Sequence, residues 1–183
     1  LDVPVPLTLG TAVSAPASAT VGASVTATAA SWNAVPSTRS FQWRRDGVDI
    51  AGATASTYTP TTADAGATLT VRETANLGYT STSSGTAVAP YNVAVPRVEI
   101  NGSTLTATSD GTWTSATAAT TALQWLRGGA VIPGATLPTY VAGTGDFGRE
   151  ICLQVTATAN GVATSAVSNC VVPAAPPSQR TAG

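Results

Sequence analysis

The chain contains one pattern of residues twice, at a spacing of about 82 residues. Each copy runs through a Gln-Trp pair, a Gly-Ala-Thr segment, a Tyr and an Asp-x-Gly corner in the same order. The matched segments are Gln42-Trp43 with Gln124-Trp125, Gly52-Ala53-Thr54 with Gly134-Ala135-Thr136, Tyr58 with Tyr140, and Asp64-x-Gly66 with Asp146-x-Gly148. The repeat predicts two copies of one module, which we place at residues 1–90 and 91–173, followed by a Pro-rich tail at 174–183.

Each module is expected to consist of β-strands. Polar and apolar or small residues alternate in short runs such as Val25–Thr28 and Ile151–Val155, and a period of two is typical of a half-buried strand. Turn-forming pairs such as Asp46-Gly47 and Asn160-Gly161 recur about every 8 to 12 residues. Short strands at this spacing predict an all-β chain of two tandem sandwiches with about seven strands each.

The composition excludes several classes of function. Only 9% of the residues are charged and the formal net charge is −1, so strong binding to nucleic acid or to an anionic membrane is not expected. The absence of His removes Ser-His-Asp and Cys-His catalysis and most zinc chemistry. No apolar run approaches the length of a membrane-spanning helix. We expect no enzyme activity, no cofactor, no metal site and no membrane insertion.

The repeated motifs, read with Trp32 and Trp113 upstream of them, resemble the bacterial immunoglobulin-like repeats of secreted and surface proteins. The Lys-free, Ala- and Thr-rich composition is similar to that of such proteins from high-GC Gram-positive organisms. The resemblance implies an immunoglobulin-like sandwich in each module. It leaves the function open, because such modules serve as stalks, adhesion units, phage-particle appendages and accessory domains of hydrolases.

Six aromatic side chains are expected to supply much of the buried area, since only about a fifth of the chain is Val, Leu, Ile or Phe. Two of the Trp residues follow Gln at the position that resembles strand C of an immunoglobulin sandwich, and the other two would close one end of each core. The alternative is that the rings form a sugar-stacking platform. The six are Trp32, Trp43, Trp113, Trp125, Tyr58 and Tyr140.

The two cysteines indicate the compartment. If Asn160-Gly161 starts a hairpin turn, the antiparallel register brings Cys152 opposite Cys170. The inward phase of Ile151 and Leu153 places Cys152 on the outer face of the sheet. We predict a cross-strand disulfide, which implies export; two reduced thiols in a cytosolic protein are the alternative. The absence of Met also fits removal of a signal peptide before Leu1.

The N-terminal segment has an aliphatic residue at every odd position and Pro at positions 4 and 6. Such a strand offers N–H donors along one edge only. It is expected to form the edge strand (1–9) of its own module or, alternatively, to add to the sheet of a neighbouring subunit. The interface in the second case would consist of Leu1, Val3, Val5, Leu7 and Leu9.

The two corner carboxylates are interpreted as structural. Asp64 and Asp146 lie at a corner where a carboxylate can accept N–H bonds from a turn. Glu73 falls at an inward position of its strand, whereas its counterpart in the second module is Val155. The candidate partners of Glu73 are Arg39, Arg72 and Arg97.

The favoured function is that of a non-enzymatic extracellular structural protein, a cell-surface, stalk or filament subunit that associates with itself or with other surface proteins. The first alternative is an adhesive or carbohydrate-binding module with glycans as partners, for which Tyr79 and Tyr91 are the spare aromatic rings. The second is a phage decoration or tail protein, although assembly in a reducing cytoplasm argues against it if the disulfide forms.

Overall fold

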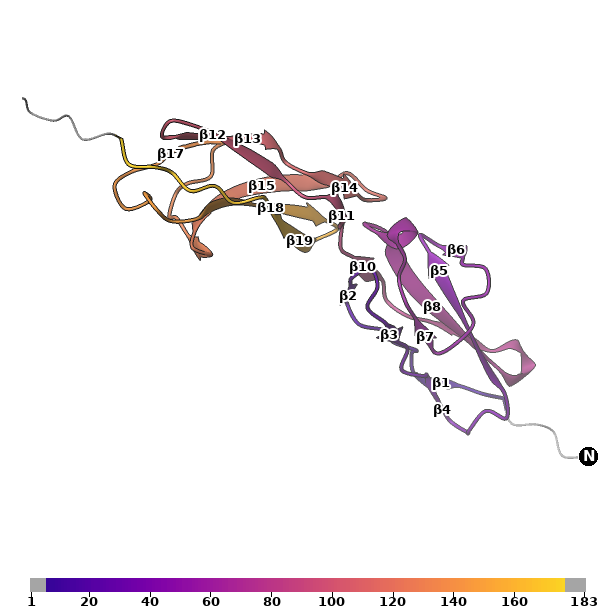
Figure 1. The fold of residues 1–183 in the computed structure, drawn as a ribbon. Helices are drawn as coiled ribbons and strands as arrows, with labels where there is room; N and C mark the ends of the chain where they lie inside the picture. Colours follow the sequence, from indigo (N-terminus) through magenta and orange to yellow (C-terminus); the bar gives the residue numbers. More distant parts are fainter. Residues whose placement is uncertain (1–5, 177–183) are drawn as a thin grey trace, which may run out of the picture. The chain divides into compact units, whose positions relative to one another are not determined.

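The computed structural model describes residues 6–176 (Figure 1). Within this range the chain forms β-strands and two 3-10 turns, η1 (Thr62–Asp64) and η2 (Asn76–Gly78), and no α-helix. The described residues divide into two units. Unit 1 comprises the chain up to Tyr91 with the short segments Ser115–Ala118 and Ala159–Val162, and unit 2 comprises the remainder. The predicted all-β fold is confirmed, although bulges and breaks split the seven strands expected in each module into more, shorter strands.

Unit 1 packs one larger sheet against a set of short strand pairs. The larger sheet has the order β2 (Ser18–Ala19), β10 (Thr86–Val88), β8 (Thr68–Ala75), β5 (Arg39–Arg45) and β6 (Val48–Asp49), with β9 (Thr80–Thr82) also on β8. The opposing pairs are β1 (Leu9–Thr11) with β4 (Ser31–Trp32) and β3 (Val25–Thr26) with β7 (Thr57–Tyr58). The core between them contains Trp43, Leu69 and Val71 from the larger sheet.

Unit 2 repeats this architecture with longer ladders. One sheet has the order β12 (Arg97–Asn101), β13 (Thr104–Ser109) and β17 (Thr139–Val141). The other has the order β16 (Ala130–Val131), β15 (Thr120–Arg127), β18 (Ile151–Ala159) and β19 (Val162–Val167), and a separate pair joins β11 (Tyr91–Ala94) to β14 (Thr112–Thr114). Residues Trp125, Leu153 and Val155 face Val98 and Leu105 in the core.

One predicted core aromatic lies at the centre of each unit's core, and the other four of the six lie closer to the margins. Trp43 and Trp125 have no exposed area. Each stacks on a partly buried tyrosine, Tyr58 or Tyr140, with ring centroids 5.8 Å apart. Their indole N–H groups donate to carbonyls 12 residues further along the chain, so each ring is buried without an unsatisfied donor. The remaining pair, Trp32 and Trp113, is only partly buried against the cores.

The N-terminal segment joins unit 1 where it enters the described part of the chain. Leu7 is buried, whereas Leu9 is 46% exposed, and β1 pairs with β4. Asn33 holds Thr8 against unit 1. Its side-chain oxygen accepts the Thr8 N–H at 2.9 Å, and its backbone N–H donates to the Thr8 carbonyl at 3.0 Å. Of the proposed donor strand, Leu1, Val3 and Val5 lie outside the described residues.

Candidate functional site

The corner carboxylate of each unit lies at the centre of a closed network of hydrogen bonds. Asp64 has no exposed area. One of its oxygens accepts from Arg45 at 2.7 Å, and the other accepts from the Tyr58 hydroxyl at 2.8 Å and from the Thr61 N–H at 2.7 Å. The Thr61 hydroxyl donates to the same second oxygen at 2.9 Å. The carboxylate therefore ties strands β5 and β7 to the turn before β8.

Unit 2 contains the same network 82 residues later. Asp146 accepts from Arg127 at 2.5 Å, from Tyr140 at 2.7 Å and from the Gly143 N–H at 2.7 Å. Here Gly143 takes the place of Thr61, so the side-chain hydroxyl bond of unit 1 has no counterpart. The sequence interpretation anticipated the turn N–H bond in both units, whereas it did not identify the Arg and Tyr donors, although both recur in the repeat.

These contacts shift the pKa of each network member. Burial alone would raise the pKa of Asp64, but the hydrogen bonds from Thr61, Arg45 and Tyr58 outweigh it and hold the pKa below its usual value. Asp146 shows the same balance and the same direction. Burial and the bond to Asp64 raise the pKa of Tyr58. A carboxylate held ionised in this way serves as an acceptor and is poorly suited to act as a general acid near neutral pH.

Glu73 is the second buried carboxylate of unit 1, with no exposed area. Of the three candidate partners, the structure selects Arg39, whose guanidinium lies 2.6 Å from the Glu73 carboxylate. The Ala30 N–H donates to the other carboxylate oxygen at 2.7 Å, and the Trp32 indole lies 3.4 Å from the first. All of these donors belong to unit 1, so Glu73 joins β8 to β5 and to the region of β4.

The predicted disulfide between Cys152 and Cys170 is present, with Cα atoms 4.4 Å apart. Cys152 is absent from the core cluster and lies opposite Leu126 on β15, which places both on the outer face of the sheet. Both are nevertheless nearly buried, at 5% and 7% exposure. The predicted face is therefore right; Cys152 is covered, whereas Cys170 is exposed.

The register that led to this pairing was wrong at the turn. Asn160 and Gly161, with φ of 49° and 75°, are the two central residues of the turn, as in a type I′ hairpin. This sets Leu153 opposite Ser168, one residue away from the predicted register. A bulge after Ser168 then shifts the pairing by one residue, so Val171 and Ile151 exchange both backbone bonds and the cysteines meet.

A buried serine forms this bulge in both units, and the sequence analysis missed it. In unit 2 the Ser168 N–H donates to the Leu153 carbonyl, and the Ser168 hydroxyl accepts the Leu153 N–H at 2.9 Å. In unit 1 Ser83 and Val71 make the same two bonds. The hydroxyl takes the place of a strand carbonyl where the ladder is interrupted. The signal is a serine recurring about 85 residues apart, which is hard to recognise in a Ser- and Thr-rich chain.

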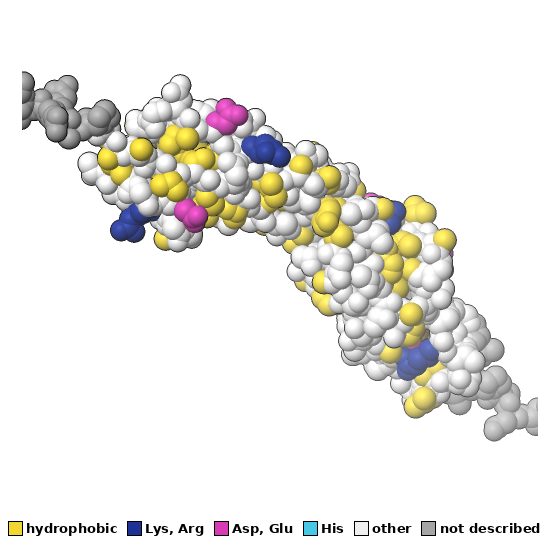
Figure 2. Space-filling model, in the orientation of Figure 1, with side chains coloured by type: hydrophobic (Ala, Val, Ile, Leu, Met, Phe, Trp, Pro, Cys, Tyr) yellow, Lys and Arg dark blue, Asp and Glu magenta, His cyan; other side chains and the backbone are white. Residues whose placement is uncertain are grey.

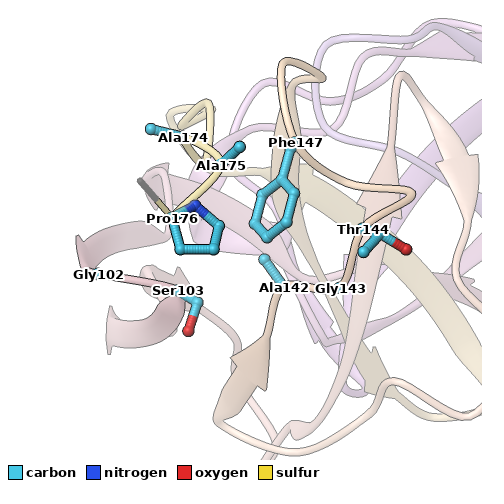
Figure 3. Close-up of a pocket in the computed structure, with 9 residues that line it drawn as sticks. All are labelled: Gly102, Ser103, Ala142, Gly143, Thr144, Phe147, Ala174, Ala175 and Pro176. Atoms are coloured by element: carbon cyan, nitrogen blue, oxygen red, sulfur yellow. The ribbon is translucent and has the colours of Figure 1, made fainter. Parts of the chain in front are cut away.

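A pocket of about 630 Å³ lies in unit 2, where the chain leaves the last strand (Figure 3). The β12–β13 turn, the corner before β18 and the segment after β19 enclose it. In Figure 3 the rings of Phe147 and Pro176 lie on its inner side, whereas the hydroxyl oxygens of Ser103 and Thr144 point away from the rings. Its lining residues are Gly102, Ser103, Ala142, Gly143, Thr144, Phe147, Ala174, Ala175 and Pro176. The lining includes no ionisable side chain, so this pocket suits a small apolar group.

Two further observations concern residues 6–176. No three His, Cys, Asp or Glu side chains in this range lie together as a metal site would require. No helix in the same range is long and apolar enough to span a bilayer.

No protein-family model matches the chain. No curated protein is similar to it in sequence. Among solved structures, the three N-terminal domains of the bacteriophage RB49 highly immunogenic outer capsid protein align at 17% identity and a TM-score of 0.39, over 90% of this chain and 59% of that one. Murine CEACAM1b aligns at 13% identity and a TM-score of 0.44, over 92% and 98%. The four N-terminal Ig domains of Dscam1 isoform 6.9 align at 14% identity and a TM-score of 0.36, over 85% and 42%. The chain thus spans less than two thirds of the phage and Dscam1 structures, and similarities this distant carry no information about its function.

Proposed function

We propose that this protein is a non-enzymatic structural module that works outside the cell, transmits tension along its chain and associates with other copies of itself. The observation that carries the proposal is the position of the disulfide. Cys170 lies three residues beyond the end of β19, directly before Val171 exchanges backbone bonds with Ile151. Cys152 lies on β18, which is hydrogen-bonded to β15 over eight residue pairs.

This position determines where a pulling force enters unit 2. Tension applied beyond Cys170 passes through the bridge into β18, in the interior of the sheet, and does not peel β19 away one hydrogen bond at a time. A bridge between β18 and the chain's exit is therefore well placed to resist load. Disulfides persist in oxidising compartments, which supports the extracellular part of the proposal.

The carboxylates support a non-enzymatic role. Each buried carboxylate among the described residues is neutralised by an arginine of its own unit: Asp64 by Arg45, Asp146 by Arg127 and Glu73 by Arg39. Most of the surface visible in Figure 2 is uncharged. A surface with few charges presents little like-charge repulsion to a second copy.

Negative-stain electron microscopy of the purified protein at high concentration tests the self-association. Ordered fibres, sheets or discrete oligomers are expected, and they should persist in 0.5 M salt because few charges are available to hold them together. Separate particles of a single chain at every concentration would contradict the proposal.

A second candidate function rests on the pocket beside Phe147. Its volume lies within the range of small-ligand sites, and an aromatic ring in an apolar lining suits a sugar face or a short apolar side chain. Saturation-transfer NMR against a panel of oligosaccharides tests this candidate. Signals that disappear in Phe147→Ala but persist in Tyr91→Ala, which changes an exposed ring outside the pocket, would establish a binding module.

A further inference from the structure

Among the strands of residues 6–176, none pairs with the outer edge of β19. In unit 2 the sheet ends at β19, which bonds to β18 along one side only. The Ser168 N–H donates to the Leu153 carbonyl. In an antiparallel ladder every second residue bonds to the same neighbour, so the backbone groups of Val162, Thr164 and Ala166 also point toward β18. The backbone groups of Ala163, Ser165 and Val167 therefore point away from β18. All three residues are exposed.

This edge also lacks the features that keep strand edges from pairing. Natural edges are protected by charged side chains, Pro, bulges or very short strands. β19 is six residues long with the sequence VATSAV, which includes no charge and no Pro. By contrast, the edge strand β12 carries Arg97 and Glu99, and the edge strand β16 has only two residues.

The counterpart of this edge in unit 1 is protected. There β9 has only three residues, and the chain then breaks before β10. The parallel strand β2 covers the far side of β10. No strand of the described part of unit 2 covers β19 in this way. The two units therefore differ at this edge, where an additional strand would fit in unit 2.

We propose that a second copy of this chain binds here, with the two β19 strands pairing antiparallel about a two-fold axis at Ser165. The outward-facing residues are self-complementary in this register, because Ala163 lies opposite Val167 of the other copy and Ser165 lies opposite its own equivalent. Small side chains at two of these three positions allow close approach, and no like charges meet. The contact is isologous and closes as a dimer, joining two four-stranded sheets into one. The inference rests on the proposed self-association and names the surface that carries it.

Opposite charges at the axis test the pairing. In Ser165→Lys two lysines meet across the axis, and in Ser165→Glu two carboxylates meet, so each variant alone should dimerise at least tenfold more weakly in sedimentation velocity experiments. An equimolar mixture of the two should restore the dimer as a heterodimer. Ser165→Ala, which keeps the backbone N–H, and Thr139→Lys, which places the charge on exposed β17, should dimerise like the unmodified chain.

The outcomes separate this inference from the proposed function. If the unmodified chain associates and Ser165→Lys associates equally well, the β19 edge is not the interface, while self-association stands. If the unmodified chain is monomeric at every concentration, both are overturned. Circular dichroism establishes that each variant is folded, and weakened association of two folded variants with recovery in the mixture is the result that the β19 pairing requires.

Discussion

In unit 1 the last strand, β10, is paired on both sides, with β8 and with the parallel strand β2. The buried Thr86 hydroxyl adds a bond of 2.6 Å to the Pro16 carbonyl at the same place. In unit 2 Val171 matches Thr86, because it lies opposite Ile151 as Thr86 lies opposite Leu69. The preceding residue, Cys170, forms a covalent bond to β18 in place of a covering strand. The same weak point, the exit of the last strand, is thus secured by hydrogen bonds in one unit and by a disulfide in the other.

The interiors of the two units also differ, because unit 1 buries more polar contacts at this level of the core. Unit 1 contains the buried Glu73–Arg39 ion pair, whereas unit 2 has Val155 and Thr121 at the matching positions. Unit 1 also has the more broken of the two smaller sheets, in which two short pairs are separated by the isolated Ser14–Thr28 bridge. The polar network of Glu73 bonds to Ala30 in this interrupted region. The comparison indicates that unit 1 depends on internal polar contacts where unit 2 depends on a continuous ladder and a covalent bridge.

The largest effect is expected from Glu73→Val, which gives unit 1 the residue of unit 2. It leaves the Ala30 N–H and the Arg39 guanidinium without their acceptor, so the free energy of unfolding should fall by about 3–5 kcal/mol. Chemical denaturation followed by tryptophan fluorescence measures it. The double variant Arg39→Thr/Glu73→Val removes the stranded charge and should recover part of the loss; equal losses in both variants would show that the ion pair is not the cause.

Removing the disulfide should lower the free energy of unfolding by slightly less. Cys152→Ala/Cys170→Ala opens a loop with a sequence separation of 18 residues, which the chain-entropy estimate values at about 3 kcal/mol. Calorimetry should show a lower melting temperature for unit 2 and an unchanged one for unit 1. Reductant should shift the unmodified chain in the same way and leave the double variant unaffected. A lower melting temperature in both units would contradict the claim that the disulfide stabilises unit 2 alone.

The bulge serines should have similar effects in the two units. Ser83→Ala strands the buried N–H of Val71, and Ser168→Ala strands that of Leu153, so each should cost about 1–3 kcal/mol. Ser40→Ala, at an exposed position of β5, is the matched control and should cost under about 0.5 kcal/mol. A loss of stability in only one of the two variants would show that the bulge serine does not stabilise both units in the same way.

The pH dependence should be the smallest effect near neutrality and should be common to both units. The lowered pKa values of Asp64 and Asp146 mean that each carboxylate stabilises the fold above the pKa it has in the unfolded chain, about 4, and that this contribution is lost as the pH falls through the folded value. The raised pKa values of Tyr58 and Tyr140 give a contribution that is present below about pH 10 and is lost as the pH rises through the folded values. Tyr140→Phe should remove the alkaline loss in unit 2 alone, which denaturation at a series of pH values measures.

The repeat and the strand periodicity were sufficient to predict the fold class, because alternation and turn chemistry are local properties of the sequence. The cysteine pairing was also predictable, since the chain has only two cysteines, one on β18 and one in the segment that follows the neighbouring strand β19. The partner of Glu73 was not, because three arginines were within reach and only the tertiary fold brings Arg39 to it. The pocket beside Phe147 was likewise hidden, since the β12–β13 turn and the segment after β19 meet there from distant parts of the sequence.

The most direct test of the central claim is to stretch the whole chain from its two ends in a single-molecule force experiment, with and without reductant. If the disulfide secures the exit of unit 2, the oxidised chain should unfold in two steps, and reduction should lengthen only the step of unit 2, by roughly 60 Å for 18 released residues, and lower its unfolding force. Steps of the same length and force in both conditions would contradict the claim that tension on this chain passes through Cys152 and Cys170.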